Sequence, residues 1–250
     1  MIIEVKNEIE FKKLCRDAWK RNAKLWIDSR KLPMRLRYYL LNLILNEGDP
    51  PSILDIGCGN GWLYEEVINF NTNFAFKYIG LDTNEFFINH LNNKVSDERA
   101  SFIDADFEEK LDQVEDNSID KAIAVLSFIE MTDLNAAFTN VYQKLKNGGV
   151  CIIVVLNPYL ELMRLNGDIN DLKNDLSVFR SGKMYYYEKK IVSDDLVSEV
   201  NYYGLLHHID NYFAIAKSCG LEINDFKEID AFDEFGPGST VYHCIEFKKP

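Results

Sequence analysis

Short apolar runs alternate with stretches of mixed polarity between Pro51 and Asn157. Runs rich in β-branched residues predict strands at residues 52–57, 76–82, 100–106, 120–127 and 150–157. Apolar positions at helical spacing between these runs predict helices at residues 61–70, 84–95 and 135–145. Because strands that alternate with helices are joined by right-handed crossovers, the pattern predicts an α/β fold with a doubly wound, mostly parallel sheet.

The segments on either side of this core have a different pattern. Apolar spacing predicts a helical cap before the core, and two late apolar runs around "DEFGPGS" predict an antiparallel strand pair at one edge of the sheet. The segment after Pro158 is helical or irregular at first and then strand-rich, which predicts an insertion forming a lid. We therefore expect one domain made of a cap (1–48), a core (49–157), a lid region (158–210) and a C-terminal helix with two strands (211–250).

Charge and cysteine content narrow the possible partners. The chain has 40 acidic residues against 28 Lys and Arg, a net charge of −12. This balance argues against binding a nucleic acid or an anionic membrane and favours a small-molecule partner. The five cysteines are scattered without CxxC spacing, so we expect no disulfide framework, no metal site and a cytoplasmic setting. No signal peptide or apolar run of membrane-spanning length is expected.

The segment "ILDIGCGNGW", residues 53–62, has glycines in GxGxG spacing directly after a predicted strand. Such a turn lets a ligand approach the backbone closely. A dinucleotide fingerprint requires a small residue where Trp62 stands, and Asp55 would lie beside a pyrophosphate of the same charge. The segment therefore favours a ligand that has a positive charge and no phosphate.

Acidic residues also end the next two predicted strands. Asp82 can accept hydrogen bonds from the two hydroxyls of a ribose. Asp104 or Asp106 can accept from an adenine amino group while Phe107 packs on the ring, and the spacing to the next strand favours Asp106. An acid at each of three strand ends, with a glycine turn at the first, indicates a pocket for a cationic adenosine, which is S-adenosylmethionine.

Residues 51–157 resemble the core of the class I S-adenosylmethionine-dependent methyltransferases. The resemblance lies in "ILDIGCGNG", "YIGLDTNEFF", "DADFEE", "NSIDKAIAVLSFIEM" and "VYQKLKNGGVCIIVV". It extends to the small-molecule branch, because "LNPYL" and "NYYGLLHHIDNYF" stand where that branch often has His-Pro and His-Arg. Asn157 replaces the first of these histidines. The resemblance implies a Rossmann-like fold and S-adenosylmethionine as cofactor, with S-adenosylhomocysteine as product.

Matched position by position, the resemblance assigns Asp55 and the backbone of the glycine turn to the methionine moiety, Asp82 to the ribose, and Asp106 with Phe107 to the adenine. The complete set of implied cofactor-binding residues is Asp55, Gly57, Cys58, Gly59, Asp82, Thr83, Asp106, Phe107 and Leu126. Glu130 stands where such proteins usually have a His or Asp near the substrate. The family's N-terminal helices fold over the site, so Trp19 and Trp26 are expected substrate contacts.

Methyl transfer from a sulfonium mainly requires a positioned nucleophile, exclusion of water and at most one base. The candidates for this base are His207 and Glu130, with His208 as an alternative. The tyrosines of the predicted lid, above all Tyr186 and Tyr203, are candidate substrate contacts.

The predicted function is transfer of a methyl group to an O or N atom of a small-molecule metabolite, by a monomer or a homodimer. Two alternatives stay open. One is a different use of S-adenosylmethionine, such as aminopropyl transfer or cyclisation. The other is a cofactor-binding subunit without catalytic activity.

Overall fold

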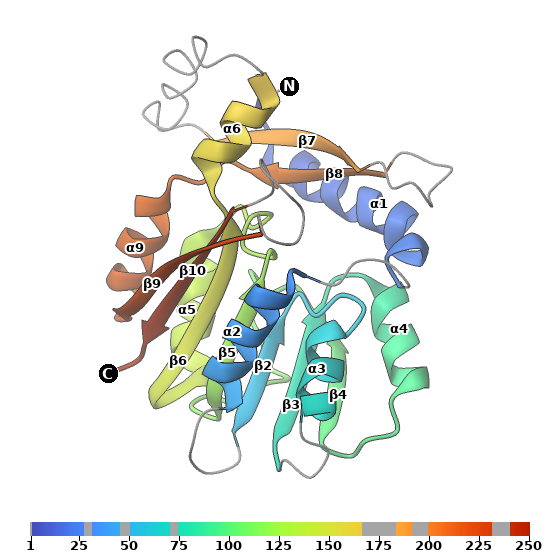
Figure 1. The fold of residues 1–250 in the computed structure, drawn as a ribbon, viewed down its shortest axis with the longest axis vertical. Coiled ribbons are helices and arrows are strands. Elements are labelled where there is room, and N and C mark those ends of the chain that lie inside the picture. The colour runs from blue at the N-terminus through green and yellow to red at the C-terminus, as the bar shows by residue number, and fades with distance from the viewer. Residues whose placement is uncertain are drawn as a thin grey trace.

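The computed structural model describes residues 2–27, 32–45, 51–70, 75–166, 184–191, 200–231 and 241–250. The described chain is built around one seven-stranded sheet (Figure 1) with the strand order β4-β3-β2-β5-β6-β10-β9. Its strands are β2 (Ser52–Ile56), β3 (Lys77–Asp82), β4 (Ala100–Asp104), β5 (Ile119–Val125), β6 (Leu145–Leu156), β9 (Glu222–Asp230) and β10 (Val241–Lys248). No helix in these ranges is long and apolar enough to cross a membrane.

Strand pairing confirms the predicted sheet. β2 pairs in parallel with β3 and β5, β3 with β4, and β5 with β6. β10 pairs antiparallel with both β6 and β9, which forms the predicted antiparallel edge. After β2 the chain adds β3 and β4 on one side, and it then returns to add β5 and β6 on the other side of β2. A doubly wound sheet binds its ligand outside the carboxyl ends of the strands at such a switch point. The glycine turn after β2 and the segment after β5 therefore meet at one place.

Helices cover the sheet on both faces. Their bounds are α2 (Met34–Leu45), α3 (Trp62–Phe70), α4 (Glu85–Lys94), α5 (Leu134–Lys144) and α9 (Ile209–Ser218), with α6 (Pro158–Asn166) following β6. Figure 1 shows α2 and α3 in front of the sheet and α5 behind it. The residues fully buried between these layers include Leu40 from α2, Phe138 from α5, and Ile53 and Ile153 from the sheet. The layering explains why the central strands are apolar on both faces.

A second, three-stranded sheet joins the N-terminal strand of the chain to two strands from the predicted lid region. Its strands are β1 (Ile2–Glu4), β7 (Tyr185–Ile191) and β8 (Val200–Leu205), in the order β1-β7-β8. The sequence pattern did not indicate β1, because three residues are too few for a strand signal and the partner strand is about 180 positions away. The predicted lid region is described only at 158–166, 184–191 and 200–210.

Helix α1 (Glu8–Trp26) packs against β8 and extends over the carboxyl ends of the parallel strands (Figure 1). It begins at Asn7, whose side chain accepts hydrogen bonds from the amides of Ile9 and Glu10. Phe11 and Cys15 are buried with Leu205 in a small apolar cluster beneath the helix. This packing fixes the opposite face of α1 toward the strand ends.

Candidate active site

A cavity of about 990 Å³ lies between α1 and the carboxyl ends of the parallel strands. It is lined by ten of the residues that the sequence suggested for cofactor or substrate. They are Trp19, Trp26, Gly57, Gly59, Asp82, Thr83, Asp106, Phe107, Leu126 and Glu130. The volume is at the upper end of ordinary ligand pockets, which leaves space for a second molecule beside a cofactor.

The glycine turn has a backbone that only glycine adopts easily. Gly57 and Gly59 have φ angles of +75° and +53°. A Cβ atom on Gly57 would lie 2.5 Å from the Cβ of Ser127, whereas one on Gly59 would meet nothing within 4 Å. The amides of Gly57 and Cys58 both donate to the carbonyl of Leu81 at 2.8 Å, so the turn is tied to β3. Its open side at Gly59 faces the cavity and provides the space for a ligand.

Asp82, at the end of β3, connects the glycine turn to the start of α4. One carboxylate oxygen accepts from the amide of Gly59 at 2.9 Å, and the other accepts from the amide of Asn84 at 2.8 Å. Burial raises the pKa of this carboxyl group, and the two amides oppose that rise. Since each carboxylate oxygen can accept more than one hydrogen bond, Asp82 can still bind a pair of hydroxyls.

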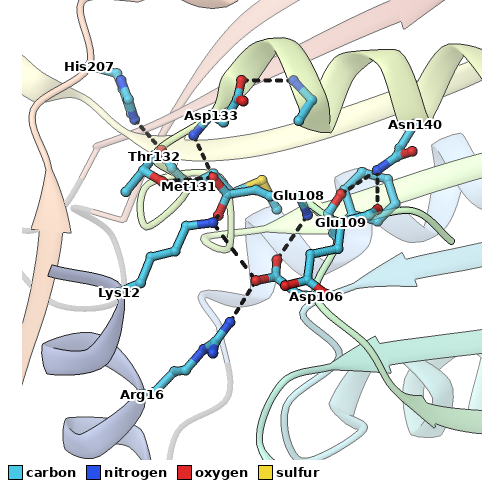
Figure 2. A network of polar contacts seen from close by, with 12 residues as sticks. Lys12, Arg16, Asp106, Glu108, Glu109, Met131, Thr132, Asp133, Asn140 and His207 are labelled. Carbon is cyan, nitrogen blue, oxygen red and sulfur yellow. Dashed lines mark hydrogen bonds and ion pairs between the residues drawn. The ribbon is translucent and has the colours of Figure 1, made fainter. Parts of the chain in front are cut away.

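Asp106 lies in the loop after β4 and lines the cavity, whereas Asp104 does not. Oδ1 of Asp106 accepts from the amide of Glu108 at 2.9 Å, and Oδ2 of Asp106 lies 2.7 Å from the guanidinium of Arg16 (Figure 2). Asn140 fixes the same loop by donating to the carbonyls of Phe107 and Glu109. The geometry therefore favours Asp106 over Asp104 for contact with an adenine.

Leu126 follows β5 at the switch point and has a φ angle of +64°, an unusual value for a residue with a side chain. The neighbouring Ser127 donates its hydroxyl to the carbonyl of Ile56 at 2.6 Å. These contacts hold the segment after β5 against the end of β2. Strain of this kind is commonly found at functional sites.

Glu130 has a buried carboxyl group in the wall of the cavity. Both of its oxygens accept from the indole Nε1 of Trp19, at 2.8 and 2.9 Å. Burial raises its pKa to about 8; the bond from Trp19 opposes the rise, and the charge of Asp82 adds to it. The ring of Trp26 lies 5.5 Å from that of Trp19. Glu130 is therefore placed as a proton acceptor or a cation ligand.

A network of polar contacts holds α1 over the cavity (Figure 2). Lys12 lies 3.0 Å from Glu108 and Arg16 lies 2.7 Å from Asp106. Glu108 also accepts from the hydroxyl of Thr132 at 3.0 Å, which connects α1 to the segment after β5. No local pattern could indicate these ion-pair partners, because they lie about 90 positions away in the sequence.

Asp55 and Cys58 do not line the cavity. Asp55 is fully enclosed beneath the turn and accepts a hydrogen bond from the hydroxyl of Tyr78; burial raises the pKa of this carboxyl group to about 7. The Cys58 side chain is completely buried, and the backbone amide of Cys58 donates to the carbonyl of Leu81. Both residues support the turn from below, a position that does not favour the direct cofactor contact implied by the resemblance.

His207 also lies outside the cavity, which does not favour the predicted role as base. Its Nε2 lies 2.9 Å from the carbonyl of Met131 and must donate to it, and burial lowers the pKa of the imidazole to about 4. His208 instead caps α9 by accepting from the amide of Asp210, and its other nitrogen lies 3.0 Å from the hydroxyl of Tyr159. Neither histidine reaches the cavity.

Tyr186 and Tyr203 pack away from the cavity as well. Tyr186 lies 5.2 Å from Phe11 and 5.9 Å from Tyr203, in the cluster beneath α1. Successive residues in a strand point to opposite faces, and Tyr202 is the β8 tyrosine that lines the cavity. Of the lid tyrosines that the sequence suggested as substrate contacts, Tyr202 thus lines the cavity, whereas Tyr186 and Tyr203 do not.

Replacing Tyr78 with Phe should destabilise the fold by about 2 kcal/mol, because it leaves the buried Asp55 carboxyl without its side-chain donor. The matched control is Tyr64→Phe. Tyr64 packs 5.4 Å from Tyr78 but donates to Asp97, which is more accessible to water. Urea unfolding of both variants would check this expectation, and equal losses of stability would contradict it.

The raised pKa of Glu130 has a measurable effect on stability. Near pH 6 the folded protein keeps a proton on this carboxyl group that the unfolded chain has lost, so stability falls as pH rises toward 8. The loss is roughly 1.4 kcal/mol for each pH unit. Glu130→Gln should therefore flatten the decline of the unfolding free energy between pH 5 and 8, measured by urea titration. Parallel curves for both proteins would contradict the buried position.

Comparison with known proteins agrees with this geometry. Residues 53–149 match the family described as "Methyltransferase domain". The sterol 24-C-methyltransferase erg6 of Aspergillus fumigatus is 28% identical over 103 residues, which are 40% of this chain and 26% of that protein. The chain thus matches about a quarter of the length of that relative.

Solved structures share the fold of most of this chain. A putative S-adenosylmethionine-dependent methyltransferase from Listeria monocytogenes has a TM-score of 0.60 at 18% identity, with 86% of this chain and 98% of that chain covered. A second structure is phosphoethanolamine N-methyltransferase 2 of Haemonchus contortus in complex with phosphomonomethylethanolamine and S-adenosylhomocysteine. It also has a TM-score of 0.60, at 16% identity, and the match covers 94% of this chain and 60% of that chain. The family match therefore identifies residues 53–149, which include the glycine turn and the strand ends, as a methyltransferase domain, and the structural neighbours show that the chain has the fold of class I S-adenosylmethionine-dependent methyltransferases.

Proposed function

We propose that the protein transfers the methyl group of S-adenosylmethionine to an O or N atom of a small-molecule metabolite, in the cavity beneath α1. The observation that carries this proposal is the convergence of Asp82, Asp106 and Glu130 on one cavity behind the glycine turn. When bound, the cofactor supplies a methyl group that its sulfonium makes electrophilic. The carboxylates, the open side at Gly59 and the apolar Phe107 fit a cationic adenosine with no phosphate.

In this proposal each part of the cavity has one task. Asp82, with Thr83 beside it, holds the ribose, while Asp106 and Phe107 hold the adenine. Leu126 and the open side of the glycine turn lie along the methionine moiety, and Asp55 positions that turn from below. The face of α1 that carries Trp19 and Trp26 excludes water from the reacting atoms, and positioning supplies most of the acceleration.

We propose a small-molecule acceptor because the rest of the cavity is lined by α1, the segment after β5 and Tyr202 of β8. The Haemonchus contortus complex, which contains phosphomonomethylethanolamine, supports a small acceptor in this fold. The match to the sterol enzyme lies in 103 residues and supports methyl transfer more than a sterol acceptor. The five free cysteines support the proposed cytoplasmic setting. We also propose that the protein acts as a monomer or a homodimer and that it has no nucleic-acid partner.

Incubation with methyl-labelled S-adenosylmethionine and a cell extract tests this function. The expected result is a labelled product of low mass together with S-adenosylhomocysteine. Label only in protein or RNA would contradict a small-molecule acceptor. Release of methylthioadenosine would favour aminopropyl transfer, and stoichiometric cofactor binding without turnover would favour a non-catalytic subunit.

A further inference from the structure

We infer that the methyl acceptor is an amine, that it binds as a cation with its nitrogen at Glu130, and that this nitrogen receives the methyl group. The inference rests on the proposed function and narrows its substrate class. It starts from a buried carboxyl group in the wall of the cavity whose only hydrogen-bond donor among the described residues is the indole of Trp19.

Glu130 has no cationic partner in the part of the chain that the structure describes. Three basic residues of α1 line the cavity: Lys12 lies 3.0 Å from Glu108 and Arg16 lies 2.7 Å from Asp106 (Figure 2), while no ion pair joins Lys20 to Glu130 among the described residues. A carboxylate is costly to bury without a positive charge beside it, so burial favours the protonated form of Glu130. A cationic ligand would supply the missing charge and stabilise the ionised form.

Aromatic side chains near Glu130 also suit a cation. Trp19 donates to the carboxyl group, and the ring of Trp26 lies 5.5 Å from that of Trp19. Both rings line the cavity, as does Tyr202. The face of a tryptophan attracts an ammonium group, and its area buries an attached apolar body. The wall around Glu130 therefore matches an amine with an apolar substituent.

The position of Glu130 along the chain places the amine near the reacting methyl group. Glu130 follows β5 four residues after Leu126, at the switch point where the glycine turn also ends. The charge of Asp82, the proposed ribose ligand, raises the pKa of Glu130 across the same cavity. An acceptor held at Glu130 is thus next to the cofactor site.

Other acceptor classes fit this wall less well. An anionic acceptor at Glu130 could not supply the positive charge that this carboxyl group lacks, and Asp82 lines the same cavity. A neutral alcohol could form one hydrogen bond to Glu130 but would bring no positive charge to stabilise its ionised form. An ammonium group provides both the charge and the donors.

The proton balance of the reaction agrees with this assignment. The bound ammonium gives one proton to the carboxylate of Glu130, which frees the nitrogen lone pair. That lone pair forms the bond to the methyl carbon as the carbon–sulfur bond breaks, and the electrons of the broken bond remain on sulfur. The positive charge passes to the methylated nitrogen, and the proton on Glu130 returns to solvent when the product leaves.

Binding of matched probes tests the inference without turnover. The pairs are hexylamine with hexanol, phenethylamine with 2-phenylethanol, and tryptamine with tryptophol, titrated by calorimetry in the presence of S-adenosylhomocysteine. At least one amine should bind 10-fold or more tightly than its alcohol. Glu130→Gln should remove that preference while S-adenosylhomocysteine binding changes less than 3-fold. Glu109→Gln, in an exposed carboxylate near the loop of Asp106, should keep it.

No amine preferred over its alcohol, or a preference that persists in Glu130→Gln, would overturn the inference. The labelled product of the activity assay gives a second readout, because carbon-13 NMR distinguishes a methyl group on nitrogen from one on oxygen or carbon. An O-methyl or C-methyl product would overturn the amine while leaving methyl transfer intact. Absence of any low-mass product would instead count against the proposed function.

Discussion

Asp82→Asn is expected to weaken binding of S-adenosylhomocysteine about 100-fold or more. The carboxylate already accepts from the amides of Gly59 and Asn84, so an asparagine must turn its NH₂ group toward one of these donors. It also loses charge-assisted bonds to the two ribose hydroxyls, at about 1.5 kcal/mol each. A total of about 3 kcal/mol corresponds to a factor of about 150 in the dissociation constant.

The matched control for this variant is Asp104→Asn. Asp104 pairs directly with Asp82 across β3 and β4 and has the same chemistry, but it does not line the cavity. Its replacement should change binding less than 3-fold in the same calorimetric titration. Similar losses from both variants would mean that only the overall negative charge matters, and unchanged binding in Asp82→Asn would remove the proposed ribose ligand.

Gly57→Ala is expected to lower the melting temperature by roughly 5 to 15 °C. The new Cβ would lie 2.5 Å from the Cβ of Ser127, in a backbone with a φ angle of +75°. Strained backbone and overpacking together cost about 2 to 4 kcal/mol, and each kcal/mol lowers the melting temperature of a domain of this size by about 2 to 4 °C. Displacing Ser127 also moves the segment after β5, so cofactor binding should weaken too.

Gly148→Ala separates the steric contact from the backbone strain. Gly148 has a similar φ angle, +79°, but a Cβ there would meet nothing within 4 Å. Its replacement should cost about 1 kcal/mol and leave cofactor binding unchanged. If calorimetric melting shows equal losses for both variants, the close approach of Gly57 to Ser127 is not the determining feature.

The parallel sheet could be predicted from the sequence because its signals are local and repeated. Buried strands such as β6 are continuous apolar runs, and each is separated from the next by a helix with its own period. The strand-end acids Asp82 and Asp106 were predictable for the same reason, since parallel strands bring their carboxyl ends to one edge. Both residues line the cavity.

Features that depend on distant contacts could not be predicted in this way. The partners of Arg16 and Trp19 lie 90 and 111 positions away, so the helical pattern of α1 indicated a buried face but not what the opposite face binds. For His207, no local pattern shows that its Nε2 donates a hydrogen bond to a carbonyl 76 positions away. The two tyrosines of β8, Tyr202 and Tyr203, had a similar ambiguity, because strand alternation leaves open which face of β8 meets the cavity.

The most direct test of the account is a crystal structure with S-adenosylhomocysteine. We expect the ribose hydroxyls within hydrogen-bond distance of Asp82, the adenine beside Asp106 and Phe107, and the sulfur facing the part of the cavity lined by Trp19 and Glu130. An adenosine bound elsewhere, or a sulfur directed away from Glu130, would contradict it.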